Sequence, residues 1–215
     1  MNRAAFTLVE IVMVIVVLGI LASLALPRLD RDVKQEAADS ILSDIRYTQH
    51  LALTDNKHKF NKSQWQRAFW KFNIESCAND SGLFIGIGTD LDYSNEPSME
   101  ESALDPINGK YMFWKNTSEC SEGLEELAIS SRIFLTNKYS IVSVEGTGGC
   151  AGVQHIGFDN TGRPHVSFSN SDQPNYASVM SDTCTFTFTM IDDSIFAIDI
   201  LPETGYAYIV GQENS

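Results

Sequence analysis

One acidic side chain interrupts an otherwise apolar stretch near the start of the chain, and its chemistry depends on finding a cation. Glu10 is the only charged residue in the 21 residues of the run 6–26. As a helix this run would span about 31 Å, one hydrocarbon thickness. A carboxylate inside a membrane is tolerated when it meets a positive charge. The run therefore predicts a membrane segment in which Glu10 is the one charged side chain.

Basic and aromatic side chains alternate in a second segment, and no acid occurs between residues 56 and 74. Its basic residues are Lys57, Lys59, Lys62, Arg67 and Lys71. Its aromatic residues are Phe60, Trp65, Phe69, Trp70 and Phe72. Such a combination can form a platform for DNA. Alternatively the aromatic rings are strand core and the basic residues face acidic neighbouring proteins, which is the interpretation we favour.

Four dispersed cysteines, Cys77, Cys120, Cys150 and Cys184, form no C-x-x-C motif and have no histidine at metal-ligand spacing. Disulfides are therefore favoured over a metal site, provided that the compartment is oxidising. Pairing in sequence order, Cys77 with Cys120 and Cys150 with Cys184, would stabilise the fold by about 3–4.5 kcal/mol for each bond on a chain-entropy basis. All three connectivities remain open on the sequence.

An acidic loop carries enough oxygen ligands for Ca²⁺. It contains Asp90, Asp92, Asn95, Glu96, Glu100, Glu101 and Asp105. The loop lacks the D-x-[DN]-x-[DN]-G frame of a calcium loop, so we interpret it as a solvated acidic loop and predict no metal, with calcium binding as the alternative that we favour less.

Two further patterns do not predict catalysis. The run 146–151 fits the G-x-G-x-x-A pattern of a dinucleotide site, but the residues after it are strand-like, so no helix N-terminus would receive a pyrophosphate. His155 and His165 could face each other across a hairpin, yet no third ligand accompanies them and we interpret them as surface residues. We predict no cofactor and no enzyme activity.

Composition limits the classes of protein that can carry these residues. The chain has 215 residues, 43% of them hydrophobic and 20% charged, which indicates a folded domain with an appendage. A net charge of −13 disfavours binding of the whole surface to nucleic acid or to anionic lipid. Residues 76–215 hold five basic and 20 acidic residues, so the charge is unevenly distributed.

The elements that position these residues differ before and after residue 57. Apolar residues recur every fourth position at Leu29, Val33, Ala37, Ile41 and Ile45, which predicts an amphipathic helix over 27–56 that packs on a sheet. Pro27 is expected to kink its junction with the apolar run.

Beyond residue 63 the pattern changes to short β-branched and aromatic runs. They lie at about 64–74, 83–88, 110–116, 127–134, 139–145, 153–158, 163–168, 183–191, 195–201 and 206–210. The turns 159–162 and 192–194 each predict a hairpin, with Gly162 in the left-handed region. The expected fold class is α+β, with a long N-terminal helix packed on an antiparallel β-sheet domain.

Three interpretations of the N-terminal segment compete. A secretory signal peptide would use Arg3, the apolar run and a cleavage site at Ser23-Leu24-Ala25, but it gains nothing from Glu10. A plain anchor would leave Glu10 without a role. The third interpretation gives Glu10 a partner and rests on a family resemblance.

The segment resembles the N-terminus of type IV pilins and pseudopilins. The matching residues are Ala5, Phe6, Thr7, Leu8, Val9, Glu10 and Pro27. The resemblance implies cleavage between Ala5 and Phe6, where the family usually has Gly before the cut, and methylation of the new amino group of Phe6. It also implies that Glu10 neutralises the N-terminal amine of a neighbouring subunit in a filament.

Two later segments, 156–164 and 198–206, look like those of the GspH/FimT-like class of minor pseudopilins. The expected organisation is a leader (1–5), a transmembrane or filament-core helix (6–26), its amphipathic continuation (27–56) and a periplasmic β-rich domain (57–215). The expected protein is a structural subunit of a type II secretion pseudopilus or type IV pilus, anchored in the inner membrane by one span. Expected partners are other pilin subunits, a prepilin peptidase and an inner-membrane assembly platform, and the alternative is a DNA-binding minor pilin for DNA uptake.

Overall fold

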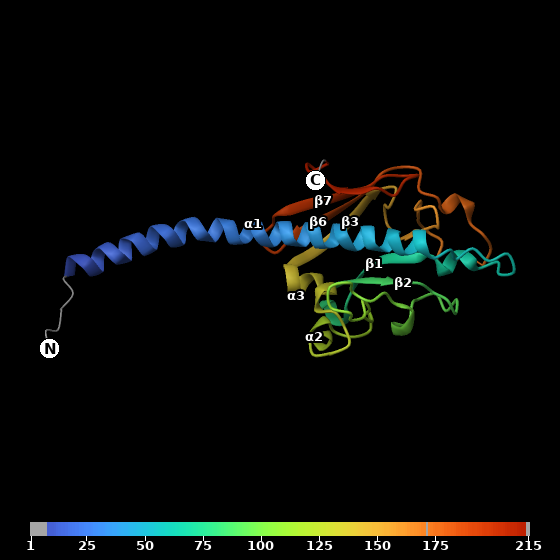
Figure 1. Ribbon diagram of the computed structural model, residues 1–215, viewed down its shortest axis with the longest axis horizontal. Helices are drawn as coiled ribbons and strands as arrows, with labels where there is room; N and C mark the ends of the chain where they lie inside the picture. Colours follow the sequence, from blue (N-terminus) through green and yellow to red (C-terminus); the bar gives the residue numbers. More distant parts are fainter. Residues whose placement is uncertain (1–7, 171, 214–215) are drawn as a thin grey trace.

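The computed structural model describes residues 8–170 and 172–213, without the side chains of residues 24–32. Ala5 and Phe6 lie outside the described residues, as does the side chain of Pro27. One long helix extends from a β-rich domain, and the first turns of the described helix lie far from that domain (Figure 1). The arrangement confirms the expected α+β class, a long N-terminal helix packed on antiparallel sheets.

Helix α1 (Leu8–Thr54) is continuous through Pro27 and curves gently in its first half (Figure 1). Its second half buries the later part of the predicted apolar face, because Ala37, Ile41 and Ile45 are all fully covered. Val33, at the start of that face, is exposed, and the side chain of Leu29 lies outside the described residues. The helix ends two residues before the expected Asn56. Polar contacts also fix it to the domain, since the Arg46 guanidinium donates to Ala207 O and Gln49 Nε2 donates to Gly162 O.

Two four-stranded antiparallel sheets form the domain. The first has the order β2 (Leu83–Gly88), β1 (Trp70–Ser76), β4 (His155–Phe158) and β5 (Pro164–His165). The second has the order β3 (Ile141–Gly148), β6 (Cys184–Met190), β7 (Ile195–Ile200) and β8 (Ala207–Ile209). The second half of α1 runs along the sheets between β1 and β7 in Figure 1.

Both predicted hairpins are confirmed. Strands β4 and β5 pair across the turn 159–162, with Gly162 at φ +83°, and β6 pairs with β7 across residues 192–194. Strand β6 alternates as predicted, because Phe186 and Phe188 are buried while the threonines between them are half-buried. Side-chain alternation along one strand therefore identified its inner face correctly.

Three predicted strand segments are wrong. Residues 110–116 and 127–134 form only single bridges, such as Tyr111 with Ile129, and the second run contains the short helix η4 (Ser131–Ile133). The start of the run 64–74 is the helix η1 (Trp65–Ala68). The apolar residues Met112 and Ile133 are nevertheless fully buried. An apolar run shows burial, but whether it pairs as a strand depends on a distant partner.

The remaining short helices join these elements. They are η2 (Ala78–Asp80), η3 (Met99–Glu101), α2 (Cys120–Gly123), α3 (Leu135–Tyr139) and η5 (Tyr176–Ser178).

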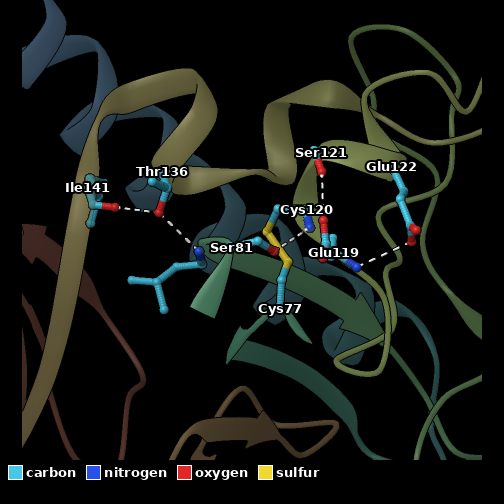
Figure 2. The surroundings of a disulfide bond; sticks show 9 residues. Cys77, Ser81, Glu119, Cys120, Ser121, Glu122, Thr136 and Ile141 are labelled. Atoms are coloured by element: carbon cyan, nitrogen blue, oxygen red, sulfur yellow. Dashed lines mark hydrogen bonds between the residues drawn. A yellow bond between two sulfur atoms is a disulfide. The ribbon is translucent and has the colours of Figure 1, made fainter. Parts of the chain in front are cut away.

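Two disulfides join the four cysteines in sequence order. Cys77 bonds to Cys120 over 43 residues and Cys150 bonds to Cys184 over 34 residues. Figure 2 shows the first bond beneath α2 and α3, where Cys120 N donates to Ser81 Oγ at 2.9 Å. All four cysteines are buried. Of the three connectivities that the sequence left open, the structure has the sequential one.

A buried ionic network fastens α1 to the loop that precedes β3. Arg132 lies 2.7 Å from Asp44 on α1 and 3.1 Å from Asp105, and it donates to Ser40 Oγ. Burial raises the pKa of Asp44 to about 6, although the adjacent Arg132 opposes that shift. Removing one member of such a network would leave an uncompensated buried charge.

Candidate functional site

The first half of α1 carries apolar side chains on every side. Residues 8–23 are all exposed, and the large apolar side chains among them range from 47% exposed at Val17 to 78% at Leu8. The sheets do not reach this half of the helix (Figure 1). A helix that is hydrophobic all round is covered by a membrane or by other helices. This surface is therefore the first candidate for function.

Glu10 is the acid on this surface. It lies in the first turn of α1, with Ile11, Met13 and Val14 beside it. A carboxylate near a helix N-terminus is favoured by the positive end of the helix dipole. Apolar side chains and the positive end of the helix dipole are thus among its surroundings.

The predicted membrane segment, residues 6–26, lies largely among the described residues, which begin at Leu8. Within that part of the chain, no helix combines the length and the apolarity needed to cross a membrane.

The basic segment does not form one surface. Arg67 is 7% exposed and donates to Asn95 Oδ1, Asn170 O and Asp172 Oδ1. Lys71 is 2% exposed, and burial lowers its pKa although Asp90 opposes that shift. Both side chains are therefore interior groups, and Arg67 links the loops that carry Asn95, Asn170 and Asp172.

The other basic residues lie at the surface or near it. Lys57 is 2.5 Å from Asp55 and lies over the Trp70 ring, whereas Lys59 and Lys62 are exposed. Among the aromatic residues, Phe69 and Phe72 are buried, Trp65 and Trp70 are half-buried, and Phe60 is 99% exposed. The structure thus leaves Lys59, Phe60 and Lys62 together on an exposed loop and removes Arg67 and Lys71 from it.

Three members of the acidic loop come together. The carboxylates of Asp90, Asp92 and Glu101 have oxygen atoms within 4.8 Å of one another. Backbone donors already occupy them, since Asp90 accepts from Ser94 N and Glu101 accepts from Leu91 N. Asp90 is fully buried, so the loop is less solvated than we expected. Asp105 lies elsewhere, in the network with Arg132.

His165 is not the surface residue that the sequence suggested. It is 3% exposed, with Nδ1 2.8 Å from Ser178 Oγ and Nε2 3.3 Å from Asp159 Oδ2. Burial would raise the pKa of Asp159, but hydrogen bonds from His165 and Thr161 outweigh it and hold that pKa well below its usual range. Ser178 is 1% exposed, so this serine, histidine and carboxylate fix a loop and no substrate reaches the hydroxyl.

His155 is half-buried at the start of β4. Its Nε2 lies 2.6 Å from Ser169 Oγ, and its ring contacts Phe168, which His165 also contacts. Burial, with Lys71 adding to it, lowers the pKa of His155 to about 4. The two histidines therefore share a buried aromatic neighbour and do not form a ligand pair.

Sequence reasoning missed a cavity of about 510 Å³ against β1 and β2. It is lined by Asn73, Glu75, Gly86, Glu96 and Trp114 together with further residues of the loops 96–102 and 112–117. Burial and the nearby Glu96 raise the pKa of Glu75. The only sequence signal was the pair of strand glycines, Gly86 and Gly88: the missing side chain of Gly86 leaves space above the sheet, whereas Pro97 packs closely over Gly88.

The apolar, Glu10-bearing start of the chain is also the part that known proteins share. Residues 1–26 match the prokaryotic N-terminal methylation motif. This match supports a type IV pilin-like subunit, and with it assembly with other pilin subunits and processing by a prepilin peptidase. The comparisons found no matching curated protein and no matching solved structure.

The motif match covers the start of α1 and none of the β domain. The matched residues include Ala5, Phe6 and Glu10, and only Glu10 lies among the described residues. The apolar half of α1 is the surface that other pilin helices would cover. The β domain lies outside the matched residues and has two disulfides and its own core.

Proposed function

We propose that this chain is a minor pilin or pseudopilin, a structural subunit of a type II secretion pseudopilus or a type IV pilus. The observation that carries the proposal is the methylation motif at residues 1–26 on a helix whose first half exposes apolar side chains on all sides. The apolar side chains of such a helix must be kept away from water, either by a bilayer or by neighbouring helices. No catalytic group enters this role, which is mechanical.

The proposed pathway assigns a task to each part of the chain. Residues 1–5 are a leader that is cut between Ala5 and Phe6, and Phe6 is then methylated on its new amine. Residues 6–26 hold the chain in the inner membrane, and the domain 57–215 folds in the periplasm, where its two disulfides form. The segment 27–56 joins the two, and the subunit leaves the membrane when it enters the filament.

Within the filament, Glu10 supplies the counter-charge for the amine of a neighbouring subunit. An ammonium and a carboxylate removed from water stabilise each other only as a pair, so the pair sets the register between adjacent helices. Pro27 belongs to the same assembly segment, where its ring removes one helical hydrogen bond and allows the helix to bend.

The GspH/FimT-like class is the subtype we propose. Its two sequence segments meet in space, because Gln49 Nε2 donates both to Gly162 O and to Thr204 O at 2.8 Å. A Cβ at Gly205 would lie 2.3 Å from Gly162 O, so the contact requires glycine there. The two turns thus form one support for α1, which is a structural reason for their sequences.

Assembly is favoured over DNA uptake by the placement of the basic residues. Arg67 and Lys71 are interior, and Lys57 pairs with Asp55, so Lys59 and Lys62 carry the exposed charge of this segment. Affinity for DNA rises with the number of phosphates that basic side chains neutralise, so two exposed lysines supply little of it. Retention of DNA by the full chain that is lost in Lys59→Glu/Lys62→Glu would contradict this preference.

Glu10→Ala tests the register role. We expect the variant to remain in the membrane and to keep a normally folded domain, while its incorporation into filaments falls at least about tenfold because an amine is left without its counter-charge. Incorporation is measured by quantifying the subunit in sheared filaments. Glu36→Ala, an exposed acid on the same helix, is the matched control and should assemble normally. Normal assembly of Glu10→Ala would remove the register role.

The N-terminal residue tests the pathway itself. Mass spectrometry of the protein from native membranes should give a chain that begins with N-methylated Phe6. A chain that begins at Leu26 would show a secretory signal peptide, and one that still begins at Met1 would show a plain anchor. Either result would overturn the proposed processing.

A further inference from the structure

The cavity beside β2 is built to receive a side chain. Gly86 forms part of its floor, where an added Cβ would meet only Asn73 Cβ, at 3.9 Å. Its walls include apolar and aromatic side chains, namely Phe84, Pro97, Met99, Met112, Phe113 and Trp114. An opening of about 510 Å³ with such walls is within the range of ligand-binding pockets.

The polar groups of the cavity favour a cation. Glu75, Glu96 and Glu100 line it against a single basic residue, Lys115. Asn73 Oδ1 is a buried acceptor without a hydrogen-bond partner. A carboxylate at Glu75 that is half-buried beside Glu96 is disfavoured as an ion until a positive charge approaches. The cavity therefore suits an apolar or aromatic group that is accompanied by ammonium groups.

A segment with that chemistry is exposed on the same chain. In the tip loop, residues 57–62, Phe60 is 99% exposed, with the exposed Lys59 and Lys62 on either side. The ring centroid of His58 lies 4.7 Å from that of Phe60 and 4.4 Å from that of Trp65, both in edge-to-face geometry. His58 thus connects the exposed Phe60 ring to the half-buried Trp65 ring. This loop follows α1 at the end of the domain opposite to the one from which the apolar half of α1 extends (Figure 1).

We propose that the tip loop of one copy enters the cavity of a second copy. Phe60 then packs against Phe113, Trp114 and the methionines, while Lys59 and Lys62 approach Glu96 and Glu100. Opposite charge selects the partner and aromatic burial supplies the affinity. The lining of the cavity contains no tip-loop residue, so the loop does not fill the cavity of its own chain.

The contact is heterologous, because its two surfaces lie on different parts of the chain. A heterologous contact that does not close into a ring repeats along an open, helical chain of copies. It thereby adds a lateral contact between domains to the contacts that α1 makes. As a filament contact it rests on the proposed function, but the recognition itself requires only two copies.

Photo-crosslinking in the full-length protein tests the contact in native membranes. A photoreactive phenylalanine analogue at position 60 should yield a cross-linked dimer of this chain, with the adduct within residues 96–117. The same analogue at Leu127, which is 85% exposed, is the control and should not reach that segment. A cross-link to a different protein, to another segment, or no dimer at all would overturn the proposal.

A binding measurement separates this proposal from the proposed function, because it needs no filament. A labelled peptide with the sequence of residues 56–63 should bind saturably to the full-length protein in detergent. Gly86→Val should weaken binding at least tenfold, since the added side chain fills the cavity, whereas Thr187→Val on β6 should leave it unchanged. Glu96→Gln/Glu100→Gln should weaken it about fivefold, and a peptide with Phe60→Ala should lose binding.

Two further results would show whether the cavity binds the tip loop or any free amine. If Nα-acetyl-lysine amide binds as tightly as the peptide, the cavity is a site for a free amine and the contact between copies is wrong. Binding that salt abolishes but Gly86→Val leaves intact would also overturn it. If the peptide binds while Glu10→Ala assembles normally, the recognition holds and only the register role fails.

Discussion

The two halves of α1 belong to one continuous helix but are stabilised in different ways. In the second half, Ala37, Ile41 and Ile45 are covered by the sheets, and the acid Asp44 pairs with Arg132 of the same chain. In the first half, residues 8–23 are exposed, and the acid Glu10 lies on that surface. The second half completes a core within the chain, and the first half presents a surface that must be covered from outside.

This difference in burial predicts which property of the protein each half of α1 controls. Substitutions in the second half should change the free energy of unfolding of the domain. Substitutions in the first half should leave that quantity unchanged and alter membrane retention or assembly. A result that reverses this division would break the comparison.

The largest expected effect is the loss of a buried side chain. Ile45→Ala should lower the free energy of unfolding by about 2–5 kcal/mol, because Ile45 is fully buried and truncation leaves a cavity. Ile15→Ala, at a position that is 63% exposed, should change it by no more than about 0.5 kcal/mol. Urea unfolding in detergent, followed by tryptophan fluorescence, gives both values. Equal effects would show that the two halves are not distinct.

Loss of a disulfide should lower the stability of the domain and of the second half of α1, which packs on it, and should leave the first half of α1 unchanged. Cys150→Ala/Cys184→Ala should lower the free energy of unfolding by about 2–4 kcal/mol, since the unfolded chain regains the freedom of a 34-residue loop. The same change at Cys77 and Cys120 should be slightly larger on this entropic basis, because that loop is 43 residues long. Helicity of residues 8–23, measured by site-directed spin labels, should be unaffected by either pair.

The smallest expected effect is a pH dependence with two opposing parts. Asp44 keeps its proton up to a pKa of about 6 in the folded protein but loses it near pH 4 when unfolded, so its contribution to stability falls as pH rises from about 4 to 6. His155, with a pKa of about 4 when folded, does the reverse, because the unfolded chain binds that proton up to about pH 6.5. The two slopes should largely cancel in the unmodified protein.

Single substitutions separate the two parts. His155→Gln should leave stability falling between pH 4 and 6, and Asp44→Asn should leave it rising, by on the order of 2 kcal/mol in each case. Urea midpoints at several pH values measure the slopes. A slope that stays flat in His155→Gln would show that Asp44 does not hold a proton in the folded state, and one that stays flat in Asp44→Asn would show that the pKa of His155 is not lowered. Glu36→Ala, on the same helix but exposed, should not change the slope.

Local patterns were sufficient for the elements whose signals lie close together in the chain. The four-residue repeat predicted the buried face of α1, and alternation in β6 predicted its inner face. Turn chemistry predicted the hairpin at Gly162. The contiguous segment around Phe6 and Glu10 identified the pilin-like N-terminus, which the motif match supports. Each of these signals spans one element, so its physics is complete within a few residues.

Only the tertiary structure decided the placements that depend on distant partners. The loops that pack over the core at Met112 and Ile133 looked like strands, because burial and pairing produce the same apolar run. The basic segment was divided into interior and exposed residues by the loops that cover Arg67 and Lys71, about which local sequence says nothing. The sequential disulfides and the cavity above Gly86 likewise depend on which segments meet across the fold.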